Sequence, residues 1–257
     1  MRLWDFFDQQ DEVPELVTVL EAPLKIECLK VNLYAEDVGE RQGEFYYVIS
    51  ARDVFKVYIG RMELILEGDI DDKRDSIKSI EFGIDMKLLY LGTEKGKIIT
   101  YELPSRQEVE QNDGNRYPVG ANGEPPRARM LGEPKQSDQK SDNDYSVLLL
   151  YRILGFLEED FFVMHVRHSG LKVWNQDTDQ FHRIEVPEYQ GEIDNIKATP
   201  DGRFVVVGFP NQSSIQFFRI EKDEATLSAL PNGKITVSTP IKHFIDCSFC
   251  KDELHIV

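Results

Sequence analysis

The residues best suited to metal or redox chemistry are Cys247 and Cys250, which form a C-x-x-C pair shortly after His243. A structural zinc site needs a second pair of ligands, and the one remaining cysteine, Cys28, is far away along the chain. A redox pair would be expected at the start of a helix, whereas these cysteines stand in an apolar, strand-like segment. We therefore predict structural cysteines that hold no metal and no cofactor.

Two histidines, His165 and His168, lie close enough in sequence to suggest a shared site. Their spacing of three places them on opposite faces of a strand, so they do not converge on one ligand. His168 is followed by Ser169 and Gly170, which indicates a turn. The spacing therefore favours a structural role, or a role in a turn, for both histidines.

Motifs that mark known catalytic sites are missing from the sequence. There is no G-x-S-x-G, no H-E-x-x-H, no phosphate-binding G-x-x-x-x-G-K-[ST], and no G-x-G-x-x-G after a strand. On this ground the sequence predicts a protein that is not an enzyme.

An acidic run, DIDDKRD, occupies residues 69–75 and contains Asp71, Asp72 and Asp75. It lacks the glycine and the terminal glutamate of a calcium-binding loop. A solvated loop is the simplest interpretation, and the three aspartates are candidates for contact with a partner.

Residues 105–144 are rich in Pro, Gly, Asn, Asp and Gln and have few apolar residues. Such a segment cannot bury enough surface to offset the entropy of ordering, so disorder is predicted. We expect that residues 110–142 can be deleted without loss of the fold. The alternative is a docking motif, for which Arg127 and Arg129 in PPRARMLG are the candidate contacts.

The composition excludes several classes of protein. The chain has 257 residues and carries 30 Lys and Arg against 46 Asp and Glu, a formal net charge of −16, so direct binding of nucleic acid is not expected. No apolar run reaches the ~20 residues of a membrane span, and no signal peptide is visible. Three cysteines indicate a reducing compartment, and we expect a cytoplasmic protein, with the nucleus or the cilium as alternatives.

The strongest pattern is an internal repeat. Residues 76–103 align with residues 192–220, so that LLYLG (88–92) matches FVVVG (204–208), and one inserted residue then brings Ile98 onto Ile215. Each copy has a strand, a tight turn, an apolar strand that ends in glycine, a polar turn and a third strand. Residues 24–66 and 145–186 repeat this pattern more loosely. Units of about 40 residues with four strands are typical of β-propeller blades.

The repeat units resemble WD repeats. RLWDF (2–6) and LKVWN (171–175) match the Trp-Asp ending of that family, and TPDGRFVVVG (199–208) matches its turn and second strand. The positions that carry the resemblance are Trp4, Asp5, Gly92, Trp174, Asp201 and Gly208. The resemblance implies an all-β propeller with four-stranded blades, in the form of about five blade equivalents. Residues 1–104 and 145–257 would hold the blades, on either side of the insertion.

The two ends of the chain each supply half a blade in this interpretation. Residues 1–23 give the last two strands of one blade, and residues 244–257 give the first two strands of another. Either the two halves complete a fifth blade, or the chain is part of a larger, seven-bladed propeller.

The resemblance to WD repeats implies a non-catalytic scaffold that binds other proteins in a complex. The alternative is a propeller-fold hydrolase or lyase with a site near the central channel, for which His168 and Asp194 are candidates at the inner strand ends. A third possibility is a fragment without a function of its own. The sequence does not identify the partner or the oligomeric state.

Overall fold

The computed structural model describes the chain in segments, namely residues 2–5, 15–19, 26–33, 45–59, 63–83, 86–104, 127–137, 147–152, 161–176, 178–184, 193, 195–199, 203–209, 213–221, 226–236, 238, 247–250 and 253–256. The regular elements in these segments are all β-strands, as the sequence predicts. They form antiparallel sheets in which neighbours in sequence are neighbours in space.

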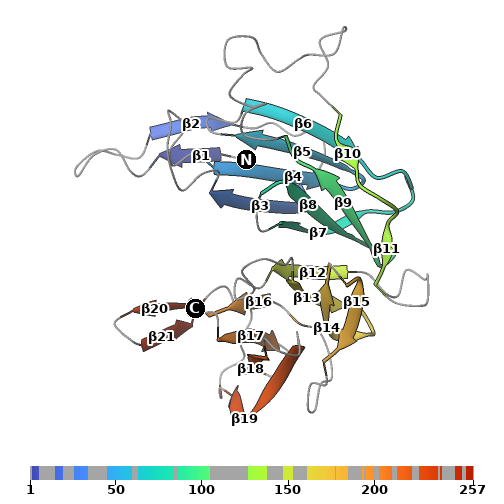
Figure 1. Ribbon diagram of the computed structural model, residues 1–257. Helices are drawn as coiled ribbons and strands as arrows, with labels where there is room; N and C mark the ends of the chain where they lie inside the picture. The colour runs from blue at the N-terminus through green and yellow to red at the C-terminus, as the bar shows by residue number, and fades with distance from the viewer. Residues whose placement is uncertain are drawn as a thin grey trace, which may run out of the picture.

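Four sheets are complete blades, lettered here in chain order (Figure 1). Blade A contains β3 (Cys28–Leu33), β4 (Phe45–Ala51), β5 (Val54–Ile59) and β6 (Glu63–Asp69). Blade B contains β7 (Ile77–Phe82), β8 (Leu88–Thr93), β9 (Lys97–Glu102), β10 (Arg129–Met130) and β11 (Lys135–Gln136). Blade C contains β12 (Val147–Arg152), β13 (Phe161–Val166), β14 (Gly170–Asn175) and β15 (Gln180–Arg183). Blade D contains β16 (Asn195–Ala198), β17 (Phe204–Phe209), β18 (Ser214–Glu221) and β19 (Thr226–Thr236).

Each end of the chain adds a two-stranded sheet. β1 (Arg2–Asp5) pairs with β2 (Glu15–Val19), and β20 (Cys247–Cys250) pairs with β21 (Glu253–Ile256). These are the half blades that the sequence predicts. In the described residues they remain separate sheets, and the ring of blades is not closed.

Strand pairing confirms the internal repeat residue by residue. In blade B, Ser79 lies opposite Gly92, and Gly92 in turn lies opposite Ile98. The equivalent positions of blade D pair in the same way, with Asn195 opposite Gly208 and Gly208 opposite Ile215. The alignment therefore places the single inserted residue correctly, in the turn between the second and third strands.

Apolar layers between neighbouring blades form the core. Val48, Phe55, Ile80 and Leu89 belong to the layer between blades A and B. Tyr90, Phe162 and Trp174 belong to the layer between blades B and C, and Val163, Val173, Val205 and Phe218 to the layer between blades C and D. The second strands are buried on both faces, which explains their continuous apolar sequences.

The outer strand of blade B comes from the predicted insertion. Arg129 pairs with Glu102 at one end of β9, and Gln136 pairs with Lys97 at the other. We call residues 127–137 the strap. Within 105–144 the prediction of disorder is thus wrong for the strap, because β9 has an open row of backbone donors and acceptors that the strap satisfies. The rest of the segment lies outside the described residues.

The strap also reaches both neighbouring blades. The amide of Ala128 donates to the carbonyl of Glu67 in blade A at 2.7 Å. On the other side, the buried Lys172 ammonium of blade C donates to the carbonyl of Ser137 at 2.7 Å. Lys135 forms an ion pair with Asp179 of blade C at 2.5 Å. Composition alone did not reveal these contacts.

The strand β19 is a second element that the repeat alignment did not include. It runs for 11 residues along the outer edge of blade D and pairs with β18 across a register shift. No helix in the described part of the chain is long and apolar enough to cross a membrane.

Candidate functional site on the inner strands

The first strands of the four complete blades lie next to one another in chain order. β3 contacts β7, β7 contacts β12, and β12 contacts β16, so these strands gather toward the middle of the molecule (Figure 1). They surround a cavity of about 330 Å³. Its walls consist of Glu27, Cys28, Leu29 and Lys30 from blade A, Lys78, Ser79 and Ile80 from blade B, Leu150 from blade C, and Asn195, Ile196 and Lys197 from blade D.

The charge of this cavity is opposite to that of the whole chain. Three of its lining residues are lysines and one, Glu27, is acidic, whereas the chain has a formal net charge of −16. Neighbouring walls of low polarity strengthen the field of such a cluster. The cavity is therefore suited to a small anionic molecule.

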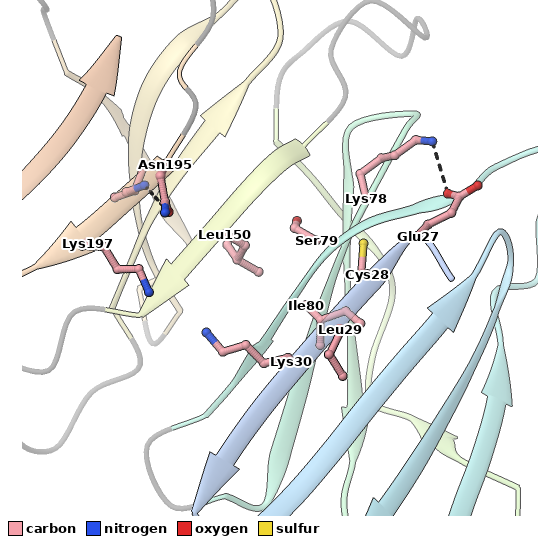
Figure 2. A pocket seen from close by; sticks show the side chains of 11 residues that line it. Glu27, Cys28, Leu29, Lys30, Lys78, Ser79, Ile80, Leu150, Asn195 and Lys197 are labelled. Carbon is pink, nitrogen blue, oxygen red and sulfur yellow. Dashed lines mark hydrogen bonds and ion pairs between the residues drawn. The ribbon is translucent and has the colours of Figure 1, made fainter. Parts of the chain in front are cut away.

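At one end of the cavity, Glu27 and Lys78 form an ion pair across blades A and B (Figure 2). The Lys78 Nζ lies 3.4 Å from Glu27 Oε2 and 3.7 Å from Glu94 Oε2. Glu94 is held in place by the Ser76 hydroxyl at 2.6 Å, and this hydrogen bond, together with Lys78, lowers the pKa of Glu94. A carboxylate and an ammonium thus stand side by side on the cavity wall.

At the other end, Lys30 and Lys197 extend toward one another from opposite walls (Figure 2). Lys30 Nζ forms an ion pair with Glu81 Oε2 at 2.6 Å. Glu81 is buried, and its other oxygen accepts a hydrogen bond from the amide of Phe82 at 3.0 Å. Glu81, which does not line the cavity, therefore fixes the position of the Lys30 ammonium.

The uncharged polar residues of the wall have structural partners. The Ser79 hydroxyl donates to the carbonyl of Val147 at 3.1 Å and so joins blade B to blade C. Asn195 accepts from the amide of Ile196 at 2.8 Å. Burial raises the pKa of the Cys28 thiol, which keeps it protonated near neutral pH. Neither Ser79 nor Cys28 is therefore activated as a nucleophile.

The predicted acidic contact residues divide into two groups. Asp71 is exposed, and Asp72 accepts a hydrogen bond from the Lys95 ammonium at 2.6 Å, which lowers the pKa of Asp72. Asp75 is buried, and its Oδ1 accepts from the amides of Ser76 and Lys95. Asp75 thus joins two turns of blade B and is not available to a partner, contrary to our interpretation of 69–75 as a solvated loop.

The predicted arginine contacts lie on the strap. Arg127 is 3.5 Å from Glu67 and Arg129 is 3.6 Å from Glu102, and both arginine side chains remain largely exposed. Their role in docking stays a prediction.

Among the repeat positions, Trp174 is buried in the third strand of blade C, where the resemblance places it. An added Cβ at Gly92 would meet Ser79 Oγ at 2.3 Å, so blades B and C require glycine there. Gly208 occupies the equivalent position in blade D. Trp4 and Asp5 lie in β1, but their side chains are outside the description, as is Asp201.

The histidines do not contribute to the cavity wall. His168 lies in the exposed turn between β13 and β14 with a positive φ of 59°, so placing it at an inner strand end was wrong. His165 is buried, and burial lowers its pKa to about 4. Asp194, the other candidate, lies outside the described residues.

No group of three or more His, Cys, Asp or Glu side chains in the described segments is placed to hold a metal ion. Cys247 and Cys250 lie in the strand β20, as predicted, but their side chains are outside the description. Their lack of metal stays a prediction.

Comparison with known proteins adds evidence on the fold. No protein-family model matches the chain, and no curated protein matches it by sequence. A similar solved structure is described as a "putative 6-phosphogluconolactonase" from Bacteroides uniformis ATCC 8492. The identity is 12% and the TM-score is 0.53, with 84% of this chain and 55% of that chain covered. The fold is that of a β-propeller. The chain spans about half the length of the solved protein, and at this identity the likeness shows the fold alone.

This comparison corrects one prediction made from the sequence. We excluded an enzyme because the motifs of known catalytic sites are missing, but the similar structure is described as an enzyme on the same fold. A propeller places residues from several blades around one cavity, so its site residues are dispersed and leave no contiguous motif. The exclusion of an enzyme was therefore wrong.

The sequence analysis also missed the residues of the cavity. Glu27, Lys30, Lys78 and Lys197 come from three different blades. A usable signal was present, because each lysine lies in the first strand of a repeat unit, which a propeller turns toward its centre. Charged residues in strands that face the centre indicate a site more directly than charged residues in connecting loops.

Proposed function

We propose that the chain is a propeller-fold hydrolase that opens a small cyclic ester in the cavity between its inner strands. The observation that carries this proposal is the pairing of Glu27 and Lys78 on the wall of a cavity of about 330 Å³. Cavities of about 300 to 1,000 Å³ bind small molecules. The description of the similar solved structure as a lactonase supports the choice of a cyclic ester.

The two paired side chains have complementary roles in this reaction. Glu27 accepts a proton from a water molecule, whose oxygen then bonds to the ester carbonyl carbon. The Lys78 ammonium, 3.4 Å from Glu27, lies beside the oxyanion that forms on the carbonyl oxygen and stabilises it. The bond from the carbonyl carbon to the ring oxygen then breaks, and Glu27 returns its proton to that oxygen. The product is an open hydroxy acid.

The test is the hydrolysis of glucono-δ-lactone and of its 6-phosphate, each corrected for the spontaneous rate. Removing a general base typically costs ~10²- to 10⁴-fold in rate, so we expect a loss of this size in Glu27→Gln. The matched control is Glu102→Gln, since Glu102 is an exposed carboxylate that pairs with a cation outside the cavity. If neither lactone is opened faster than in buffer, or if the two variants lose activity equally, the proposal is wrong.

We further propose that the chain is related to the WD-repeat proteins. Trp174 at the end of a third strand and the matched pairing of Gly92 and Gly208 support this relationship.

A further inference from the structure

We infer that Glu94 is a positioning residue, which holds the Lys78 ammonium on the cavity wall beside Glu27. This inference rests on the proposed function, because it concerns the cation that stabilises the oxyanion in that reaction. Lys78 lies in β7 and lines the cavity, whereas Glu94 directly follows β8 and does not line it. Glu94 therefore acts on the reaction through Lys78 and does not contact the substrate.

The Lys78 ammonium has two carboxylate partners. Its Nζ is 3.4 Å from Glu27 Oε2 (Figure 2) and 3.7 Å from Glu94 Oε2. A lysine ammonium is a compact charge on a flexible stem, so with one carboxylate partner it would move directly onto that partner. A direct charged hydrogen bond measures about 2.7 to 2.9 Å, and the distance to Glu27 is longer. The attraction of Glu94 thus keeps the ammonium from neutralising Glu27, which must accept a proton in the proposed reaction.

Glu94 is itself fixed by hydrogen bonds within blade B. The Ser76 hydroxyl donates to Glu94 Oε2 at 2.6 Å, and the amide of Glu94 donates to the carbonyl of Ser76 at 2.8 Å. The buried Asp75 carboxylate accepts from the amides of Ser76 and Lys95 at 2.8 and 3.0 Å, and so joins the segments that carry Ser76 and Glu94. These bonds place the Glu94 carboxylate before any ligand arrives.

The charge of Glu94 is maintained by its surroundings. The hydrogen bond from Ser76 is the main cause that lowers the pKa of Glu94, and the positive charges of Lys78 and of Arg167, in the turn after β13, lower it further. Partial burial acts in the opposite direction. Glu94 therefore stays ionised to a lower pH than an ordinary glutamate and keeps its attraction for Lys78 over that range.

The first test is the hydrolysis of glucono-δ-lactone by Glu94→Gln, a change that removes the charge and keeps the shape. We expect kcat to fall by about two- to fivefold, because an ion pair between partly exposed groups is weak. KM should change little, since Glu94 does not line the cavity. The matched control is Glu102→Gln, whose exposed carboxylate pairs with Arg129 outside the cavity, and its kcat should equal that of the wild type.

The pH profile of kcat distinguishes positioning from a purely structural role. Ser76→Ala removes the hydrogen bond that is the main cause of the lowered pKa of Glu94, so this pKa rises and Glu94 loses its charge at a higher pH. We expect the acid limb of the profile to move to higher pH in Ser76→Ala, whereas Glu94→Gln has no such shift. A rate that falls in Ser76→Ala by the same factor at every pH would mean a structural role and overturn the inference.

A titration of the Glu94 side-chain carboxyl, followed by carbon-13 NMR, tests the contact without catalysis. The midpoint should rise in Lys78→Met, because the ammonium that favours the ionised form is gone. It should stay unchanged in Lys56→Met, since Lys56 pairs with Glu67 away from the cavity. An unchanged midpoint in Lys78→Met would show that Glu94 does not hold Lys78, and the inference would be wrong.

Together these measurements separate the inference from the proposed function. If lactones are opened but Glu94→Gln and Glu102→Gln have equal kcat, the hydrolase stands and the positioning role is wrong. If neither lactone is opened but Lys78→Met shifts the titration of Glu94, the proposed reaction is wrong, and the position of Lys78 still depends on Glu94.

Discussion

Blades B and D are two copies of one repeat, and they differ mainly at their outer edges. Their first three strands pair in the same register, with Ser79 and Asn195 at equivalent inner positions. The fourth strand of blade D is the continuous β19, whereas in blade B the strap supplies two short strands. The repeat therefore fixes the strands that pack between neighbouring blades and leaves the outer edge free to vary.

The two copies also pack against different faces of blade C. The face toward blade B is aromatic, with Trp174 stacked on Phe162 at 5.2 Å and Tyr90 in edge contact with Phe162 at 4.6 Å. The face toward blade D is mainly aliphatic, and Val163 and Val173 lie in its layer. One sheet thus supports two unlike interfaces, because alternate residues of a strand point to opposite faces.

The largest expected effect comes from removing the strap. Deleting 110–142 removes the Ser137 carbonyl, one acceptor of the buried Lys172 ammonium, and opens the edge of β9. Loss of a hydrogen bond to a charged group costs about 1.5 to 3 kcal/mol, and the unpaired strand edge adds to this cost, so we expect a large fall in the melting temperature, contrary to our expectation from the sequence. Thermal unfolding followed by circular dichroism measures it.

The matched control deletes only 110–124 and keeps the strap. Shortening a connection changes loop-closure free energy by about 0.6 kcal/mol for each twofold change in length, so stability should change little. Similar melting temperatures for both deletions would mean that the strap contributes little to the stability of blade B.

A smaller loss is expected from Gly92→Ala. The added Cβ would lie 2.3 Å from Ser79 Oγ and 2.7 Å from Val147 Cγ1, so blades B and C must move apart. Overpacking of this kind costs about 1 to 3 kcal/mol, measurable by urea unfolding. A cycle with Ser79→Ala should be non-additive by about 0.5 kcal/mol or more, because the two side chains compete for one space. Strict additivity would exclude this clash as the cause.

A third effect concerns the other face of blade C and is present only at acidic pH. His165 lies opposite Leu171 on the face toward blade D, and burial lowers its pKa to about 4. Because its unfolded pKa is about 6.5, the unfolded chain binds the proton first as the pH falls. The stability that the neutral histidine contributes is complete above pH 6.5 and is lost toward pH 4. We expect a loss of about 2 kcal/mol between pH 7.5 and pH 5.

His165→Gln should reduce this pH dependence, whereas His182→Gln should preserve it, since His182 is exposed in β15. Urea unfolding at the two pH values measures both variants. An unchanged slope in His165→Gln would assign the pH dependence to other groups.

Most of the blade architecture could be predicted from the sequence. The continuous apolar second strands and the glycines at 92 and 208 carried enough information to align the two copies, and strand pairing confirmed the alignment. The strap could not be predicted, because the segment that contains it is mostly polar and much of its order comes from backbone hydrogen bonds to β9 and to Glu67. The composition of a segment indicates how much apolar surface the segment can bury. It gives no information on an unpaired strand edge elsewhere in the chain to which the segment can add a strand.

The candidate site was harder to predict than the fold. Lys30, Lys78 and Lys197 are separated by long stretches of sequence, and only the circular order of the blades brings their strands together. The acidic run 69–75 was predicted as a contact surface because its charges are adjacent in sequence. The Asp75 carboxylate instead accepts hydrogen bonds within blade B. Adjacency in sequence was a poor guide to a site that several blades share.

The strap affects the order in which the blades unfold. In repeat proteins each unit contacts its neighbours alone, so unfolding can begin at one end and proceed unit by unit. The strap bonds to blade A through Ala128, to blade B through β10 and β11, and to blade C through Lys135 and Ser137. Blades A, B and C are thereby coupled beyond nearest neighbours and form one cooperative unit. The strap contacts described above do not reach blade D, so we expect blade D to detach at lower free energy.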